Sequence, residues 1–233
     1  MTRTYSNFNT DSSQVQLGRL ADKTTAPNAY KDAMTSLGKH LGEIVSTKMP
    51  DSASTAYLAC TVEDADYLAR GMLTVLEQHL QSVSLACFWN ERFSPFGVSE
   101  IKASPIIRKY AEPANSTVNH LVIIKSIISG GCVVKTNLND LIQTINPENI
   151  FIVAPVIYIG AEQKLALEFD SSVCEKFQFI YLAKDNERTD RGEVIPGIGG
   201  MVYERLGFDG QEGKNKYVPE IVKTRRRQLV ASQ

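Results

Sequence analysis

The hydrophobic positions of this chain fall into short continuous runs that alternate with longer segments of helical spacing. Apolar runs of strand length cover residues 55–62, 82–89, 120–124, 149–159 and 177–183. Segments with helical spacing cover residues 29–44, 62–80, 132–145 and 161–169. Strands that alternate with helices favour a parallel sheet with helices packed against it. The pattern therefore predicts an α/β fold, with a mostly parallel sheet flanked by helices.

The two ends of the chain lack this pattern and are polar. Residues 1–14 are predicted to form a flexible N-terminal arm, and residues 15–220 a single domain. Residues 221–233 are predicted to form a basic C-terminal tail, which carries Lys223, Arg225, Arg226 and Arg227. Inside the domain, Glu63 and Asp64 are expected in the first turn of the helix over 62–80, where acidic side chains are favourable.

Composition excludes several classes of protein. The 25 Lys and Arg residues nearly balance the 26 Asp and Glu residues, so bulk charge favours neither nucleic acid nor an anionic membrane. The N-terminus has no signal-peptide core and no apolar run has the length of a membrane span, so we expect a cytoplasmic protein. The four cysteines and three histidines have no spacing typical of a metal site, and we expect reduced thiols and no protein-bound metal.

The segment with the clearest chemistry is "HLVIIKSIISGGCVVKTNL", residues 120–138. Glycines between a strand and a helix let backbone amides approach an anion, and the helix adds its free N–H groups. Ser126 and Ser129 offer hydroxyl groups, so the loop suits a 5′-phosphate; a tight turn alone also recruits glycines, and both interpretations stay open. The loop contains Lys125 but no Asp or Glu.

This loop resembles the loop of type I phosphoribosyltransferases that binds 5-phosphoribosyl 1-diphosphate (PRPP), where two acidic residues precede a Thr-Gly-Gly-Thr/Ser element. The segment "RGEVIPGIGGMVYERLGF" (191–208) is similar to the base-binding segment of uracil phosphoribosyltransferases, Tyr-Ile-Val-Pro-Gly-Leu-Gly-Asp-Ala-Gly-Asp-Arg. Residues 17–38, 69–93 and 150–169 also resemble segments of that family, so the likeness covers nearly the whole chain after the first dozen residues.

The resemblance implies transfer of ribose 5-phosphate from PRPP to uracil, giving UMP and pyrophosphate, with Mg²⁺ accompanying PRPP. It assigns the 5′-phosphate cup to Ser129, Gly130, Gly131 and Cys132, with Lys125 and Ser126 beside it. It assigns the uracil slot to Ile195, Pro196, Gly197, Ile198 and Gly199, with Gly200 following them. Arg92 falls on an arginine expected to bind pyrophosphate. The resemblance also implies a homodimer.

The departures from the family concern its acidic residues. In register with the loop, the two family acids fall on Ile124 and Lys125, and a further Asp falls on Gly200. A family arginine falls on Tyr67, and Arg70 replaces it only with a shift of register. Lys125 is expected to bind a phosphate, to pair with a nearby carboxylate or to point to solvent. Glu91 and Glu100 are candidate acids from outside the loop, although exposed glutamates are the ordinary case.

These residues lead to three functional hypotheses. Because the glycines remain while the acids are lost, the first is a catalytically weak or inactive relative that binds PRPP or a nucleotide as a regulatory or protein-interaction subunit. The second is an active uracil phosphoribosyltransferase. The third is a structural subunit of a larger assembly, with residues 1–14 and 223–227 as contact points for a protein partner.

Overall fold

A computed structural model of the chain describes residues 3–93, 103–114, 117–190 and 192–231. Glu100, which was a candidate acid, and residue 191, which begins the segment likened to a base-binding segment, lie outside the described residues. Among the described residues, no helix combines the length and the apolar character that a membrane crossing requires.

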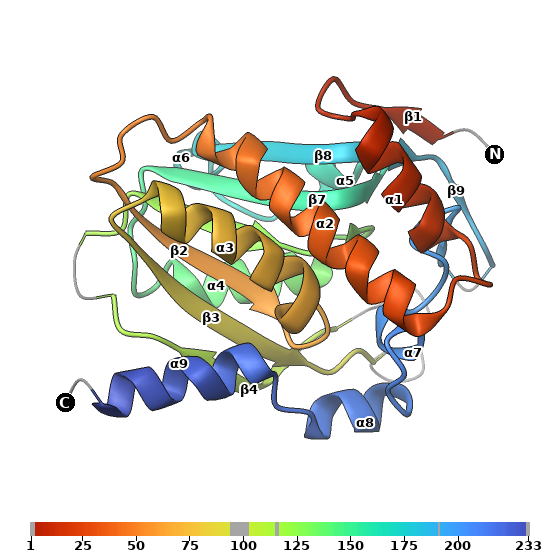
Figure 1. The fold of residues 1–233 in the computed structure, drawn as a ribbon. Helices are drawn as coiled ribbons and strands as arrows, with labels where there is room; N and C mark the ends of the chain where they lie inside the picture. The colour runs from red at the N-terminus through yellow and green to blue at the C-terminus, as the bar shows by residue number, and fades with distance from the viewer. Residues whose placement is uncertain (1–2, 94–102, 115–116, 191, 232–233) are drawn as a thin grey trace.

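The described residues form one large mixed sheet, drawn in Figure 1, and one small sheet. The strands of the large sheet are β1 (Arg3–Tyr5), β2 (Thr55–Thr61), β3 (Ser82–Asn90), β4 (Ile106–Ala111), β5 (His120–Ile124), β6 (Ile127–Ile128), β7 (Asn149–Tyr158) and β8 (Phe177–Asp185). Their order is β1-β8-β7-β5-β2-β3-β4, with β6 beside β7. Among the described strands of this sheet, only the edge strands β1 and β4 pair antiparallel, so the mostly parallel sheet is confirmed. Strands β9 (Glu187–Arg188) and β10 (Val194–Ile195) form the small sheet.

Helices cover both faces of the large sheet (Figure 1). One face carries α1 (Asp11–Ala21), α2 (Pro27–Ser46), the π-helical turn η1 (Ala65–Ala69) and α3 (Arg70–His79). The other face carries α4 (Cys132–Leu141), α5 (Ala161–Ala166) and α6 (Ser171–Cys174). The chain then ends with α7 (Val202–Arg205), α8 (Gly210–Lys216) and α9 (Glu220–Ala231).

The central strands bury side chains on both faces, which explains their continuous apolar runs. In β2, Leu58 and Cys60 belong to the core under α2 and α3, whereas Tyr57 and Ala59 belong to the core over α4. Successive side chains of a strand point to opposite faces, so a strand between two helical layers needs apolar residues at every position. Because these strands are parallel, their carboxyl ends and the loops after them lie at one edge of the sheet.

Both chain ends are more ordered than the sequence suggested. Residues 3–5 form β1 against β8, and helix α1 begins at Asp11, so the structure differs from the flexible arm predicted for residues 1–14. The reason is Arg3, whose Nε and Nη2 donate to the buried carboxylate of Asp185 at 2.8 and 2.7 Å.

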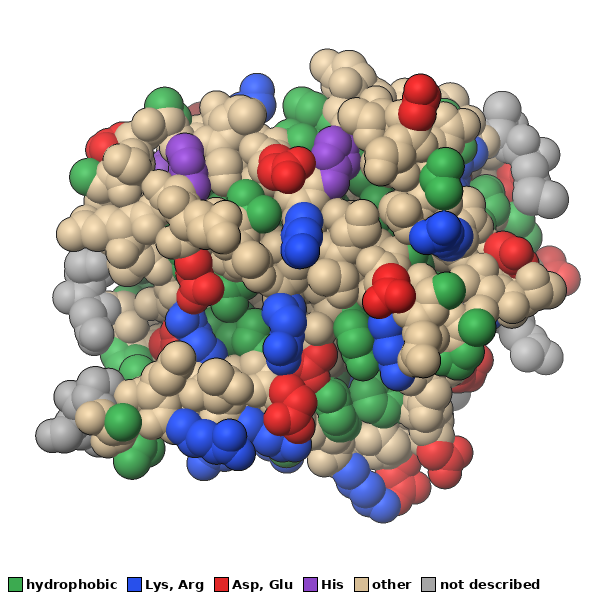
Figure 2. Space-filling model, in the orientation of Figure 1, with side chains coloured by type: hydrophobic (Ala, Val, Ile, Leu, Met, Phe, Trp, Pro, Cys, Tyr) green, Lys and Arg blue, Asp and Glu red, His purple; other side chains and the backbone are tan. Residues whose placement is uncertain are grey.

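The basic C-terminal tail is helix α9, which runs beside β3 and β4 (Figure 1). Arg225 is tied to the domain by ion pairs with Glu77 and Glu112, at 2.8 and 2.9 Å. Arg226 and Arg227 are exposed, and Figure 2 shows basic side chains gathered over this helix. The run of charges is therefore part of an ordered helix that packs against the sheet.

Candidate functional site

A cavity of about 790 Å³ opens at the edge of the sheet where the parallel strands end. Residues 127–131 of the glycine loop (residues 126–131) form one wall, and α4 begins at the end of the loop. Arg92 and Phe93 reach the cavity from the loop after β3, and Arg188 and Val194 reach it from β9 and β10. Ligands of open α/β sheets generally bind outside the carboxyl ends of the strands, so this position suits a binding site.

The predicted phosphate cup lies in this cavity. Ser129, Gly130, Gly131 and Cys132 all line it. Gly131 has φ +75° and is the residue before the first turn of α4, so the free amides of that helix lie beside the cup. Ser126 lies deeper, at 0% exposure, and its Oγ has no hydrogen-bond partner in the described part of the chain.

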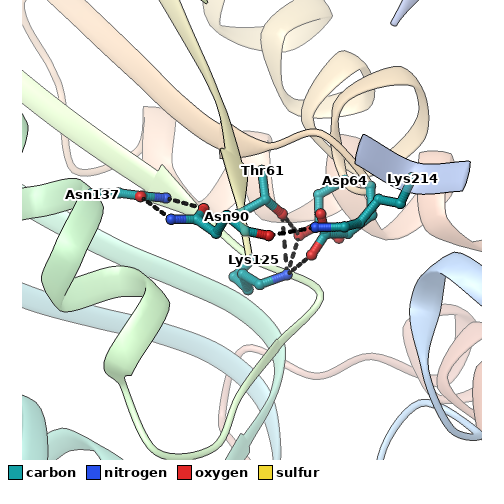
Figure 3. A network of polar contacts seen from close by, with 7 residues as sticks. Thr61, Asp64, Asn90, Lys125, Asn137 and Lys214 are labelled. Carbon is teal, nitrogen blue, oxygen red and sulfur yellow. Dashed lines mark hydrogen bonds and ion pairs between the residues drawn. The ribbon is translucent and has the colours of Figure 1, made fainter. Parts of the chain in front are cut away.

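Lys125 does not reach into this cup as a free cation. Its Nζ donates to Asp64 Oδ2 at 2.7 Å, to Glu63 Oε1 at 3.1 Å and to Thr61 Oγ1 at 3.1 Å (Figure 3). The lysine is 4% exposed. Of the three interpretations offered for Lys125, pairing with a carboxylate is the one the structure adopts.

The two acids of this cluster do not lie where the sequence pattern predicts them. Glu63 and Asp64 lie in the turn between β2 and η1, before any helical residue, and not in the first turn of a helix. Strands β2 and β5 are parallel neighbours, with Cys60 in register with Ile124. The loops that follow them therefore meet, and the acids after β2 contact the lysine after β5.

Charge in this cluster is fixed by its burial and its ion pairs. Burial alone would raise the pKa of Glu63, but the positive charges of Lys125, Lys214 and Arg92 bring that pKa down to about 2. Burial opposes the charge on Lys125, yet Asp64 and Glu63 raise the pKa of its ammonium. One oxygen of each acid, Glu63 Oε2 and Asp64 Oδ1, has no hydrogen-bond partner among the described residues.

A second, smaller cavity of about 40 Å³ adjoins the ion cluster. Glu63, Ser126 and Lys214 line it, and Arg92 and Lys125 line both cavities. Lys214 comes from α8, where its buried Nζ donates to the carbonyl of Asn90 at 2.6 Å, and burial lowers the pKa of this lysine (Figure 3). The C-terminal segment thus contributes a cation to the edge of the sheet.

The two arginines named as candidate ligands have different surroundings. Arg92 lines the cavities, and its backbone N–H donates to Gln211 Oε1 at 3.1 Å. Arg70 is not among the described residues that line either cavity. Its guanidinium pairs with Asp66 at 2.8 Å on the surface, because the two residues are one helical turn apart. The structure therefore does not place Arg70 in the site.

The predicted uracil slot is only partly at the cavity. Ile198 and Gly200 line it, whereas Ile195, Pro196, Gly197 and Gly199 do not. A side chain at Gly197 or Gly199 would lie 2.3 Å from a backbone oxygen, that of Val194 or Leu20, and both glycines have positive φ. These glycines are therefore required for close backbone packing within the fold.

Backbone groups of the same segment already have partners. The N–H of Gly197 donates to Asp185 Oδ2 at 2.8 Å, and its carbonyl accepts from Arg3 at 2.7 Å. The carbonyl of Ile198 accepts from the hydroxyl of Tyr30 at 3.1 Å. Fewer main-chain donors and acceptors are thus open to a base than the pattern of residues 195–200 implied.

The site also contains four residues that were not predicted to belong to it: Arg188, Lys214, Glu63 and Asp64. For the two acids a signal existed, because both follow a buried strand directly, as Lys125 does. For Arg188 and Lys214 the sequence offers no comparable signal. The described residues contain no group of three or more His, Cys, Asp and Glu that could hold a metal ion.

Comparison with known proteins gives likenesses of structure only. No family model matches the sequence, and no curated protein matches it. The solved structure of the AQ2163 protein from Aquifex aeolicus has 12% identity and a TM-score of 0.65, and the match covers 84% of this chain and 94% of that one. At such identity the likeness concerns the fold alone.

Two phosphoribosyltransferases are also among the similar structures, at lower TM-scores. Hypoxanthine phosphoribosyltransferase from Staphylococcus aureus has 14% identity and a TM-score of 0.42, with 68% of this chain and 76% of that chain covered. The APRTase from Giardia lamblia has 10% identity and a TM-score of 0.41, with 64% and 80% covered.

Proposed function

We propose that this chain binds PRPP or a nucleotide in the cavity at the sheet edge and has weak or no phosphoribosyltransferase activity. The observation that carries the proposal is the position of Lys125. Its ammonium lies within 3.1 Å of Glu63 and Asp64, the acids beside the glycine loop, so the carboxylates of the site are held in ion pairs. The proposed role is that of a regulatory or protein-interaction subunit that senses such a ligand.

Binding of a phosphate is supported by the cup and by the charge around it. The loop from Ser129 to Cys132 presents backbone next to the N-terminal end of α4, which favours an anion. Lys135 is paired with Glu168 at the cavity, and Lys125 with its two buried acids. Arg92, Lys164 and Arg188 also line the cavity, and the remaining acid among its described lining residues is Glu193. The excess of positive charge suits a phosphorylated ligand.

Poor turnover is supported by the chemistry of the transfer. The anomeric carbon gains positive charge as pyrophosphate leaves, so carboxylates near the ribose would stabilise the transition state and an ammonium group would oppose it. Loss of one such preorganised group raises a barrier by about 3–4 kcal/mol. Lys125 stands where the related enzymes have an acid, and Ile124 before it cannot hydrogen-bond a ribose hydroxyl.

Mg²⁺ enters this proposal only as a companion of PRPP. Mg²⁺ is commonly held by substrate phosphates with one or two carboxylates rather than by a protein cage. Since Glu63 and Asp64 are occupied by Lys125, the oxygens of PRPP would be the main ligands of the ion. When bound with PRPP, the Mg²⁺ ion would neutralise part of the negative charge of the pyrophosphate group.

Calorimetry with PRPP, UMP and uracil, each with and without Mg²⁺, tests the binding part. We expect saturable binding of PRPP or UMP. Incubation of the protein with labelled uracil, PRPP and Mg²⁺ tests the catalytic part, and we expect no UMP above the uncatalysed background. Absence of any heat with all three ligands would refute the ligand-binding role and favour a structural subunit. Turnover at about 1 s⁻¹ or faster would refute the inactive role.

One observation favours the active enzyme as a second candidate. Glu63 lines the small cavity next to the loop, and its buried Oε2 has no hydrogen-bond partner among the described residues. An active site could use this oxygen for the ribose diol. In that case Glu63→Gln would abolish UMP formation, whereas Glu91→Gln, which changes an exposed glutamate nearby, would leave it intact.

A further inference from the structure

Arg188 is an arginine at the cavity whose guanidinium stacks on an aromatic ring and has two donors without a partner among the described residues. It lies in β9, paired with Val194 of β10, and lines the main cavity. Its guanidinium carbon lies 3.6 Å from the centroid of the Tyr158 ring, at the end of β7. Stacking on an aromatic face holds the plane of a guanidinium in place and leaves its edges for hydrogen bonding.

One edge of this guanidinium is buried without partners. Arg188 Nε and Nη2 have no hydrogen-bond partner in the described part of the chain, although both atoms are shielded from solvent. Buried donors of a charged group are ordinarily satisfied, so two on one group point to a missing acceptor. Arg3 shows what this edge binds, because its own Nε and Nη2 hold both oxygens of the Asp185 carboxylate.

The charges around Arg188 favour an acceptor supplied by a ligand. The glycine loop at the same cavity suits one phosphate. Among the described residues, the lining side chains whose charge is not neutralised by an ion pair are three cations and one acid: Arg92, Lys164, Arg188 and Glu193. A ligand with a single phosphate, bound at the glycine loop, would leave Nε and Nη2 of Arg188 without an acceptor. A ligand with a second oxyanion would satisfy it in a bidentate manner.

We propose that Arg188 selects ligands that carry a second oxyanion group in addition to the 5′-phosphate. The second group is a carboxylate on the base or a second phosphate on the ribose. Either one would present two oxygens to Nε and Nη2 once the groups that shield these two atoms from solvent move aside. This inference rests on the proposed function, because it requires a ribose phosphate in the same cavity. It adds a substrate class that the glycine loop and residues 195–200 do not specify.

Calorimetry with three matched uridine nucleotides tests the inference. The probes are UMP, orotidine 5′-monophosphate with a carboxylate on the base, and uridine 3′,5′-bisphosphate with a second phosphate. We expect one of the two doubly anionic probes to bind at least tenfold more tightly than UMP. In Arg188→Gln this preference should fall to less than twofold, while affinity for UMP should change by less than threefold.

Two further variants separate a specific contact from loss of charge or of folding. Arg188→Lys keeps the charge but not the planar edge, and should also lose most of the preference. Arg227→Gln removes an exposed arginine of α9 and should behave like the unmodified protein. Thermal unfolding by circular dichroism establishes that each variant is folded before its affinities are compared.

The outcomes distinguish this inference from the function on which it rests. If UMP binds but neither doubly anionic probe binds more tightly, Arg188 has no selective role and the proposed function stands. A preference that persists in Arg188→Gln also overturns the inference. If none of the three nucleotides binds and PRPP gives no heat, the proposed function fails, and the role of Arg188 fails with it.

Discussion

Lys125 is a buried cation whose three hydrogen-bond partners come from the last residue of β2 and from the loop after it. Replacing it by methionine keeps a similar volume but leaves Glu63 and Asp64 charged and without their cation. Breaking a buried ion pair in this way generally lowers the free energy of unfolding by about 3–5 kcal/mol. We therefore expect Lys125→Met to lower the stability of the protein by that amount in urea denaturation followed by circular dichroism.

The matched control is the same substitution in a protein that already carries Glu63→Gln and Asp64→Asn. There the methionine faces neutral amides, and we expect the substitution to lower the free energy of unfolding by less than about half as much as it does in the unmodified protein. Equal losses in the two backgrounds would mean that the packing of the Lys125 side chain, and not its charge, stabilises this edge of the sheet.

The glycine loop and α4 make up the element most directly tied to ligand binding. Gly131 has φ +75°, and an added Cβ would lie 3.4 Å from Leu165 Cδ1, whereas nothing lies within 4 Å of an added Cβ at Gly130. Holding alanine in the left-handed region destabilises a protein by about 1–2 kcal/mol. We expect Gly131→Ala to lower stability by this amount and to weaken binding of PRPP at least tenfold, because the turn that sets the cup must shift.

Gly130→Ala serves as the control for this element, and it should change stability and PRPP affinity little. Both quantities can be measured by urea denaturation and calorimetry on the same preparations. Similar effects of the two alanine substitutions would indicate that the turn tolerates a side chain at either position, and that the positive φ of Gly131 does not shape the cup.

The elements that the sequence predicted well are those with many apolar residues. The run at 120–124 coincides with β5, and the helical spacing around Tyr30 and Leu41 coincides with α2. β1 was missed because three residues carry no periodic signal, and only Arg3 with Asp185 shows why they are ordered. The order of strands cannot be read from a chain, so the contact of Glu63 with Lys125 was not foreseen.

At the scale of the whole molecule, acidic and basic side chains are nearly equal in number, but some of them are buried in contacts between distant segments of the chain. Buried acids such as Glu63 lie against cations from distant segments, among them Lys125 and Lys214. Asp185 likewise joins Arg3 of the N-terminal strand to Gly197 near the cavity. Stability should therefore depend on pH more steeply than the balanced composition suggests, since these contacts exist only when the chain is folded.

Glu63 sets the clearest part of that pH dependence. Its pKa is about 2 in the folded protein, below the ordinary value of 4.5, so its contribution is complete above pH 4.5 and is lost as the pH falls towards 2. A shift of this size corresponds to roughly 3 kcal/mol. Burial also lowers the pKa of His120 from 6.5, so protonating this histidine removes stability below that pH, but it does so equally with and without Glu63.

We expect the stability difference between the unmodified protein and Glu63→Gln, measured by urea denaturation, to change by roughly 3 kcal/mol between pH 5 and pH 2, in the direction that disfavours the unmodified protein. In a Lys125→Met background the movement should be much smaller, because the nearest cation that lowers the pKa of Glu63 is gone. A difference that stays constant with pH in both backgrounds would mean that the charge of Glu63 adds nothing to the free energy of unfolding. The ion cluster would then contribute no more to stability than an exposed ion pair does.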